Sequence, residues 1–171
     1  NLFSEGCVLG AAPQDLKYRG EASVLMIGHN NVFGRKATAH VGTALGGWLT
    51  RIGDDNVLMD GCHVAHDCYV DDHTRLGRNV LLAGHIRVES GAVIGDLAGL
   101  HHFTTIGRYA RVGDRTPVRR DVPPYTDFRS DYYDNNPPAV RGVYEAGLAA
   151  AGLARPEEAE LRRALQELFD D

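Results

Sequence analysis

The chain has 171 residues, of which 43% are hydrophobic, and its 18 Lys and Arg against 23 Asp and Glu give a net charge of −5. This length suits one domain, or one domain with an appendage, and it can bury a sizeable core. The acidic balance argues against nucleic acid as the main partner. The sequence contains no long apolar run and no signal peptide, so we predict no membrane insertion. The cysteines, Cys7, Cys62 and Cys68, form no CxxC pair, which favours a reducing, cytoplasmic setting.

A six-residue hydrophobic period is present from the start of the chain. Leu9 lies three units of six before Ile27. Such a period is typical of a hexapeptide parallel β-helix, in which three units form one coil of a triangular prism. The chain begins at Asn1 without methionine and is already in register, so we predict that N-terminal coils are missing from this sequence.

Two segments interrupt the period and are predicted to be loops. Residues 14–20 are too polar to continue a unit of six and are predicted to project from the prism. Thirteen residues separate Ala39 from Ile52 where six would suffice, so residues 43–49 contain a seven-residue excursion. Its glycines and Trp48 suit a mobile loop that closes over something.

Between Ile52 and Val118 the period has no exception, and it predicts the fold. A strand alternates with period two and a helix with period 3.6, so neither alone explains a period of six. Residues three units apart should stack at the strand spacing of about 4.8 Å. We therefore predict a mainly β fold, with a parallel β-helix over residues 1–125. The aliphatic positions are Ile52, Leu58, Val64, Val70, Leu76, Leu82, Val88, Ile94, Leu100, Ile106, Val112 and Val118.

The C-terminal part changes character after the two prolines within residues 121–125, which cannot donate to a strand ladder. Residues 126–138 are polar and are predicted to form a linker. From residue 139 to 171 the apolar spacing becomes helical, which predicts a short helical appendage.

Five of the eight histidines fall between positions 63 and 102: His63, His66, His85, His101 and His102. The register of three units per coil places His66, Gly84 and His102 in one column, and Asp67 and His85 in the next. These side chains then share one patch roughly 10 Å tall. Imidazoles at this density predict a functional site. The other three histidines are predicted to be ordinary surface residues: His29, His40 and His73.

The patch contains the components of acyl transfer to a hydroxyl group. His66 can act as a base, Asp67 can orient an imidazole, and the Gly84 N–H can face a developing oxyanion. The alternative is a metal, because three imidazoles bind Zn²⁺ with an open fourth position.

Four sequence runs make a family resemblance specific. Residues 58–68 read LMDGCHVAHDC, and this run resembles the active-site signature of the UDP-N-acetylglucosamine O-acyltransferases of lipid A biosynthesis. QDLKY at 14–18, LAGH at 82–85 and DVPPY at 121–125 occur in the family's order and spacing.

The resemblance implies a homotrimer of left-handed β-helices with active sites between subunits. It implies the first step of lipid A biosynthesis, in which a 3-hydroxyacyl chain moves from acyl carrier protein to the 3-hydroxyl of UDP-N-acetylglucosamine. It implies no metal and no other cofactor. The arginines between 108 and 120 would face the acidic carrier protein.

The resemblance also implies roles for individual residues. His66 would be the general base, Asp67 its partner, and the Gly84 N–H the oxyanion donor. Residues that would contact substrate follow from the same signature: Asp15, Lys17, His63, His85, His101 and His102.

Three features depart from the family's pattern. His102 stands where the family has Gln. Asp114 stands at the position that reads acyl-chain length, where long-chain members have Gly, so a shorter or different acyl group is expected. Tyr144, Ala150 and Ala151 replace the Asn and two Arg that hold the nucleotide.

Two other readings remain open. One is a zinc hydratase resembling the γ-class carbonic anhydrases, although these need a longer His-to-His spacing than that from His63 to His66. The other is a non-catalytic trimer, or one with an altered acceptor, that has kept the fold.

Overall fold

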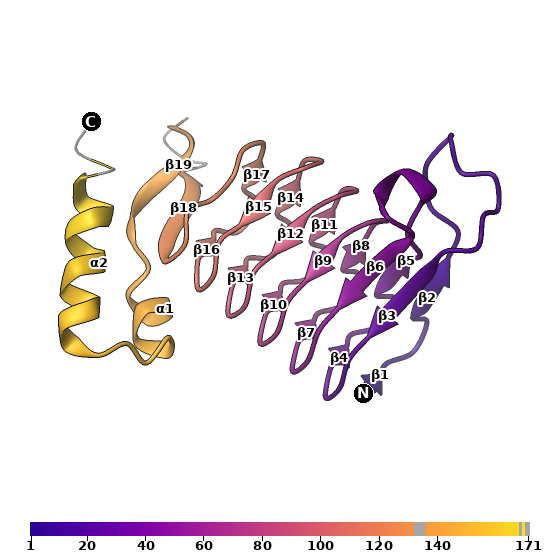
Figure 1. Cartoon of the computed structure of the whole chain (residues 1–171), viewed down its shortest axis with the longest axis horizontal. Helices are drawn as coiled ribbons and strands as arrows, with labels where there is room; N and C mark the ends of the chain where they lie inside the picture. Colours follow the sequence, from indigo (N-terminus) through magenta and orange to yellow (C-terminus); the bar gives the residue numbers. More distant parts are fainter. Residues whose placement is uncertain (132–135, 168, 170–171) are drawn as a thin grey trace.

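The computed structural model describes residues 1–131, 136–167 and 169, and it shows an elongated prism of stacked coils (Figure 1). The chain advances along the prism one coil at a time, from the N-terminus at one end to two helices at the other. Within the coils all strands pair in parallel. The parallel β-helix predicted from the six-residue period is confirmed.

The three walls of the prism are three sheets, named here sheets A, B and C. Sheet A contains β1 (Leu2–Phe3), β4 (Val32–Phe33), β7 (Val57–Leu58), β10 (Arg75–Leu76), β13 (Val93–Ile94), β16 (Arg111–Val112), β18 (Thr126–Asp131) and β19 (Asn136–Val143). Sheet B contains β2 (Val8–Ala11), β5 (Thr38–His40), β8 (His63–Val64), β11 (Leu81–Leu82), β14 (Gly99–Leu100) and β17 (Pro117–Val118). Sheet C contains β3 (Val24–Ile27), β6 (Leu49–Ile52), β9 (Tyr69–Val70), β12 (Arg87–Val88) and β15 (Thr105–Ile106).

The aliphatic residue of each six-residue unit points into the prism. In sheet B, Val64 pairs with Leu82 and Leu82 with Leu100, so equivalent residues of successive coils stack as predicted. All three are nearly or fully buried, whereas Leu81, one residue before Leu82, is 55% exposed. Each buried aliphatic side chain contributes about 1.5–3 kcal/mol. The stacked ladder is therefore the core.

Both predicted interruptions are loops in the structure. Residues 12–23, between β2 and β3, contain no strand. The excursion between β5 and β6 contains a short 3₁₀ helix, η1 (Ala44–Gly46). Because of this insertion Ala39 pairs with Val64, whereas an uninterrupted period would pair it with Val57.

The prediction of a linker at 126–138 is wrong, because the described part of this segment forms strands. β18 pairs in parallel with β16 and antiparallel with β19, so this segment completes sheet A. Phe128 pairs with Val112 and is 2% exposed, so it extends the inward ladder by one more coil. Asp127 and Arg129 flank Phe128 and form an ion pair at 3.6 Å. The strand is concealed in the sequence because these charged neighbours leave no apolar run.

The helical appendage begins later than predicted, because the chain stays extended to Val143. Two helices follow, α1 (Glu145–Ala150) and α2 (Arg155–Glu167). Arg162 of α2 donates to both carboxylate oxygens of Glu145, at 2.8 and 2.6 Å, which ties the helices together. Gly147 of α1 lies so close to Tyr109 O that no side chain fits between them, so α1 packs directly on the last coils. Among the described residues no helix is long and apolar enough to cross a membrane.

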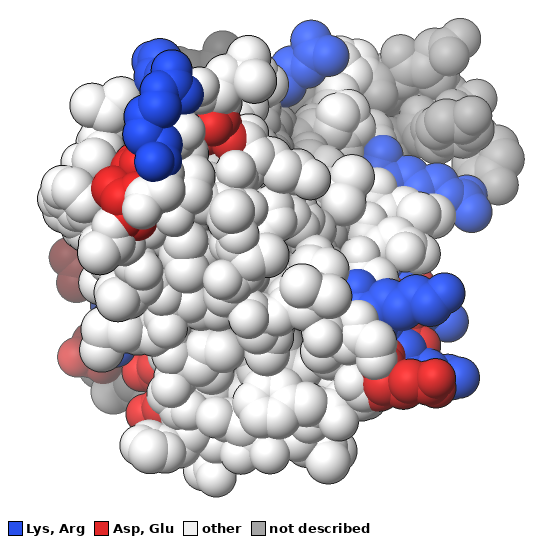
Figure 2. Space-filling model, turned by 90° about the vertical axis from the view of Figure 1, so that its right-hand side faces the viewer, with Lys and Arg blue, Asp and Glu red and all other residues white. Residues whose placement is uncertain are grey.

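The N-terminal end of the prism is mostly uncharged, as Figure 2 shows. Apolar side chains there are about half exposed or more: Leu2, Phe3, Val8, Val24 and Met26. This end differs from the C-terminal end, which β18, β19 and the helices cover (Figure 1).

The contrast between adjacent inward and outward leucines gives a test of the ladder. Leu82→Ala should lower the free energy of unfolding by about 2–5 kcal/mol, because it leaves a cavity in the core. Leu81→Ala is the matched control and should cost about 0.5 kcal/mol or less. Urea unfolding at one protein concentration measures both, and equal losses would contradict the inward ladder.

Candidate active site

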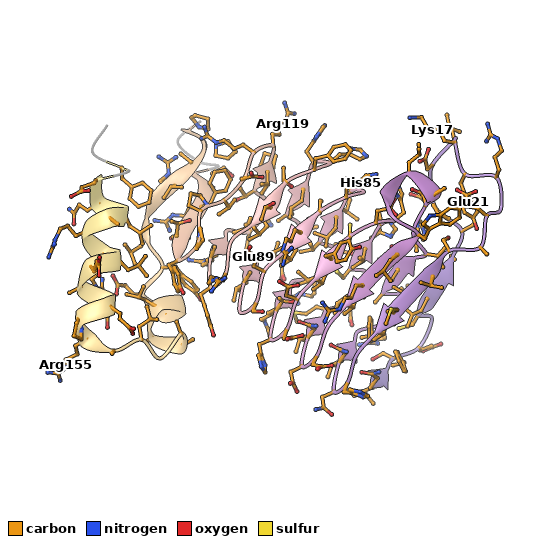
Figure 3. The ribbon with its side chains drawn as sticks, viewed as in Figure 1. Lys17, Glu21, His85, Glu89, Arg119 and Arg155 are labelled. Atoms are coloured by element: carbon orange, nitrogen blue, oxygen red, sulfur yellow. The ribbon has the colours of Figure 1, made fainter. Side chains whose placement is uncertain are left out.

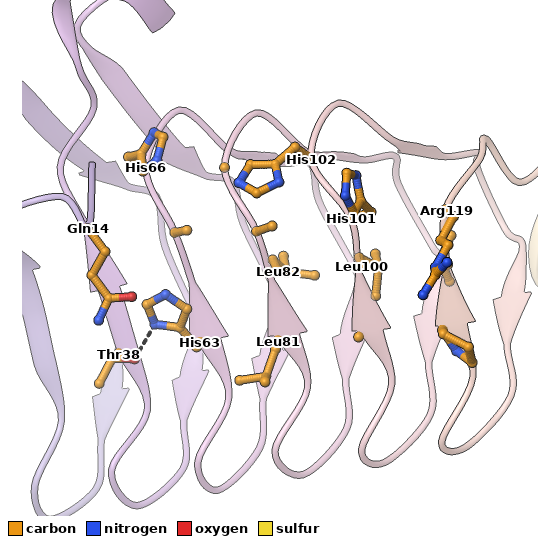
Figure 4. A pocket seen from close by; sticks show the side chains of 16 residues that line it. Gln14, Thr38, His63, His66, Leu81, Leu82, Leu100, His101, His102 and Arg119 are labelled. Atoms are coloured by element: carbon orange, nitrogen blue, oxygen red, sulfur yellow. Dashed lines mark hydrogen bonds between the residues drawn. The ribbon is translucent and has the colours of Figure 1, made fainter. Parts of the chain in front are cut away.

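A cavity of about 640 Å³ runs along the outer face of sheet B (Figure 4). Four of the five clustered histidines line it, together with small and apolar residues. The lining residues are Gln14, Thr38, His63, Ala65, His66, Leu81, Leu82, Ala83, Gly84, Gly99, Leu100, His101, His102, Pro117, Val118 and Arg119.

His66 and Asp67 form a buried pair at one end of the cavity. His66 Nδ1 lies 2.7 Å from Asp67 Oδ2. The Asp67 side chain is fully buried and that of His66 is 9% exposed. Asp67 adopts a left-handed backbone with φ of 60° at the corner of the coil, a conformation that Asp tolerates better than most residues. With the proton on Nδ1, His66 donates to the Asp67 carboxylate, and its Nε2 lone pair is then available to act as a base.

Thr43, which the sequence analysis did not select, holds the other side of Asp67. Its backbone N–H donates to Oδ1 and its hydroxyl to Oδ2, both at 2.7 Å. A side chain at Gly46 would collide with the Asp67 carboxylate, so the loop lies directly on the acid. The loop predicted to close over something therefore closes over Asp67. The excursion in the period was the only signal for it.

Gly84 lies directly beside His66, one coil further along. A Cβ added at Gly84 would stand 2.5 Å from His66 Cε1, so only glycine leaves room for the imidazole. The Gly84 N–H donates no hydrogen bond to any described residue, and Gly84 lines the cavity. A backbone donor is thus available next to His66, in the column predicted for residues 66, 84 and 102.

His63 is joined by a histidine that was predicted to be a surface residue. Thr38 Oγ1 lies 2.7 Å from His63 Nδ1, and the His40 ring packs edge-on against His63 at 4.7 Å between centroids. The surface prediction for His40 is wrong, since it is 6% exposed. The insertion after β5 lengthens that coil, so a strict register of three units misplaces His40 relative to His63. Burial, followed by the nearby imidazole of His66, lowers the pKa of His40.

His85 supports the pair without lining the cavity. Its ring stacks on Phe103 at 4.6 Å and meets His66 edge-on at 5.3 Å. His85 Nε2 lies 3.6 Å from Asp67 Oδ2. Burial lowers the pKa of His85, and the Asp67 carboxylate opposes that shift.

The remaining predicted contacts separate into two groups. His101 and His102 line the cavity, with rings nearly perpendicular and 5.2 Å apart. Asp15 and Lys17 do not line it: the Asp15 carboxylate accepts the Lys17 N–H at 2.9 Å, and Lys17 is exposed at the loop tip (Figure 3). Gln14, which the analysis did not select, is the member of this loop that reaches the cavity.

Residues expected to set chain length and to hold the nucleotide lie outside this chain's cavity. Asp114 stands at a different corner of the prism, between sheets A and B, and its carboxylate accepts the Asp96 N–H at 2.9 Å. Tyr144, Ala150 and Ala151 flank and end α1. Their roles remain predictions.

The arginines between 108 and 120 do not form one surface. Arg111 pairs with Asp127 at 3.6 Å on sheet A, and Arg120 lies over the Phe128 ring and donates to Pro138 O. Arg119 lines the histidine cavity. The period explains this dispersal, because successive units of six lie on different walls of the prism.

One group of described residues has metal-ligand composition: His66, Asp67 and His85, whose ligand atoms lie within 4.8 Å of one another. Both oxygens of Asp67 already accept hydrogen bonds at 2.7 Å, from Thr43 and His66. A metal would have to displace these donors, so the arrangement fits a hydrogen-bonded pair better than a metal site.

Comparison with known proteins places the chain in a class. Residues 49–84 match the bacterial transferase hexapeptide family (six repeats). The structure superposes on a UDP-N-acetylglucosamine O-acyltransferase of Moraxella catarrhalis with a TM-score of 0.92 and 34% identity, over 99% of this chain and 64% of that one. A UDP-N-acetylglucosamine acyltransferase of Bacteroides fragilis gives a TM-score of 0.90 at 31% identity, with the same shares covered. The fold is thus a left-handed parallel β-helix of hexapeptide repeats, as in these acyltransferases.

Within that class the relatives agree on one family. An acyl-(acyl-carrier-protein)–UDP-N-acetylglucosamine O-acyltransferase of Verminephrobacter eiseniae is 41% identical over 98% of this chain and 62% of its own length. A protein of the same name from Gloeothece citriformis is 40% identical over 99% of this chain and 59% of its own. The chain is similar to these acyltransferases over almost its whole length, and it spans about three fifths of the length of these relatives.

Replacing Thr43 tests whether the loop holds the buried acid. Thr43→Val should lower the free energy of unfolding by about 1–3 kcal/mol, because the buried carboxylate loses a donor. Thr43→Ser keeps the hydroxyl and should lose less than about 1 kcal/mol. Equal stability of the two variants in urea unfolding would show that the hydroxyl does not support Asp67.

The buried His40 predicts a pH-dependent stability. Because burial lowers the pKa of His40 in the folded state, the unfolded chain binds its proton first as the pH falls. Stability should therefore decline from pH 7.5 to 5.5, across the ordinary histidine value of about 6.5. His40→Gln should reduce this decline, whereas His73→Gln, at an exposed site, should not. An unchanged pH dependence in His40→Gln would contradict the assignment.

Proposed function

We propose that the protein transfers a 3-hydroxyacyl chain from acyl carrier protein to the 3-hydroxyl of UDP-N-acetylglucosamine, the first step of lipid A biosynthesis. The observation that carries this proposal is the buried His66–Asp67 pair beside the uncommitted Gly84 N–H. These groups open onto a cavity with an apolar floor, which suits an acyl substrate. The names of the relatives support the same reaction.

The geometry suggests how the reaction would proceed. His66 Nε2 takes the proton from the acceptor hydroxyl while Asp67 stabilises the resulting imidazolium. The hydroxyl oxygen attacks the thioester carbonyl carbon, and the Gly84 N–H donates to the oxyanion of the tetrahedral intermediate. The C–S bond then breaks, and the imidazolium returns its proton to the departing thiolate. The products are an ester and the free thiol of the carrier protein.

Partners and assembly follow from the proposed reaction. The donor would be acyl carrier protein, the acceptor a UDP-sugar, and the setting the cytoplasm. Asp114 lies at the A–B corner, away from this chain's cavity, so it can read acyl-chain length only in the cavity of a neighbouring subunit. A homotrimer with sites between subunits would satisfy this requirement.

Two alternatives rest on specific observations. The cluster of His66, Asp67 and His85 would favour a zinc hydratase, but the hydrogen bonds to both Asp67 oxygens weigh against it. Ala150 and Ala151 would favour a trimer without catalysis or with another acceptor. Both alternatives predict that no acyl group reaches UDP-N-acetylglucosamine.

Single-turnover transfer from a panel of acyl carrier protein thioesters to UDP-N-acetylglucosamine tests the proposal. His66→Ala should reduce transfer by about 10²–10⁴-fold, because the general base is lost. His73→Ala, at an exposed corner, is the matched control and should transfer at the wild-type rate. Transfer should also survive a metal chelator.

The outcomes separate the alternatives. A wild-type rate in His66→Ala would reject His66 as the base. No transfer with any thioester from a folded sample would reject the acyltransferase, and zinc bound in that sample would support the zinc hydratase.

A further inference from the structure

The cavity on sheet B has two chemically different ends. Residues one coil apart stack along this sheet, so Ala65, Ala83, His101 and Arg119 form one outward column. The column crosses four coils, so its ends are three strand spacings apart, or roughly 14 Å. Figure 4 shows His66 at one end and Arg119 at the other, with His101 and His102 between them.

The floor between these ends is apolar and open. The neighbouring outward column contains Leu81, Gly99 and Pro117, one on each successive coil. Apart from Gly99 itself and its two chain neighbours, no described heavy atom lies within 4 Å of the place where a Cβ of Gly99 would stand. A ligand can therefore lie along the floor from His66 toward Arg119.

The far end of the cavity carries a cation and no carboxylate among the residues that the structure describes. The described lining residues include no carboxylate, and Arg119 is the one Lys or Arg among them. The Arg119 side chain has no hydrogen bond or ion pair with any residue that the structure describes. Arg120, its neighbour, is engaged with Phe128 and Pro138. The free guanidinium of Arg119 is thus available to a ligand.

The donor set fits phosphate. A guanidinium presents a planar fork of N–H groups that matches phosphate oxygens in pairs, and two imidazoles can donate to the remaining oxygens. Both substrates of the proposed reaction carry phosphate: the acceptor as a nucleotide diphosphate, and the carrier protein as the phosphodiester of its prosthetic arm.

We propose that Arg119, assisted by His101 and His102, is a phosphate-binding subsite for a substrate of this cavity. This inference rests on the proposed function for the identity of the substrate. Arg119 also gives the cavity a cation, whereas Ala150 and Ala151 of α1 carry no charge.

Calorimetric titration of the folded protein with UDP and with uridine tests the subsite. Arg119→Ala should weaken UDP binding by about 10- to 100-fold, because a charged hydrogen bond is lost, and should leave uridine binding unchanged. Arg119→Lys should recover part of the affinity. Arg155→Ala, an exposed arginine at the start of α2, is the matched control (Figure 3) and should bind UDP as wild type does.

Steady-state kinetics identifies which substrate supplies the phosphate. If UDP affinity is unchanged while the KM for the acyl carrier protein thioester rises about tenfold or more, the subsite holds the donor. Unchanged UDP affinity with unchanged KM for both substrates would overturn the proposal, as would a wild-type protein that neither binds UDP nor transfers acyl groups.

These readouts separate the subsite from the reaction. UDP binding needs no turnover, so weaker binding in Arg119→Ala from a protein that transfers nothing would retain the subsite and reject the acyltransferase. If Arg119→Ala instead transfers acyl groups normally, with unchanged UDP affinity and KM values, the acyltransferase would be retained and the subsite rejected.

Discussion

The whole structure depends on one repeated contact, the stacking of an inward aliphatic side chain on its equivalent in the next coil. Val64, Leu82 and Leu100 show it in sheet B, where each pairs with the next and is almost fully buried. Since every coil repeats the same spacing, the contact also fixes the outward residues in columns. His66 and Gly84 are neighbours for this reason, although a full coil of chain separates them. The core and the site are thus consequences of the same register.

The site adds a second constraint, a carboxylate removed from water. Asp67 is fully buried, and a buried charge is costly unless donors surround it. Thr43 supplies two donors and His66 a third, so the loop after β5 is bound to the acid by hydrogen bonds. The pair of glycines at 46 and 84 has the complementary role, because each leaves the space that Asp67 or His66 occupies. Hydrogen bonds and close packing from several segments therefore hold both His66 and Asp67 in place.

Periodicity predicts most of the fold and about half of the site, and particular residues show where it stops. The ladder from Ile52 to Val118 is predicted in full because inward packing imposes the period directly. Phe128 continues the ladder, yet it follows Val112 at less than the regular interval of three units, so the predicted linker hid a strand. His40 escapes prediction for a related reason, since the insertion after β5 lengthens the interval between paired residues. Thr43 and Gln14 lie on loops, where no period relates sequence distance to spatial distance.

The sequence by itself determined the prism, the columns and the meeting of His66, Asp67 and Gly84, because a strict repeat converts position along the chain directly into position in space. Only the tertiary structure decided what surrounds them. It placed Thr43 on the acid, buried His40, dispersed the arginines over different walls and left Arg119 free at the cavity's far end. Those contacts join segments across insertions and corners, and they depend on loop conformation and packing, which hydrophobic spacing does not encode.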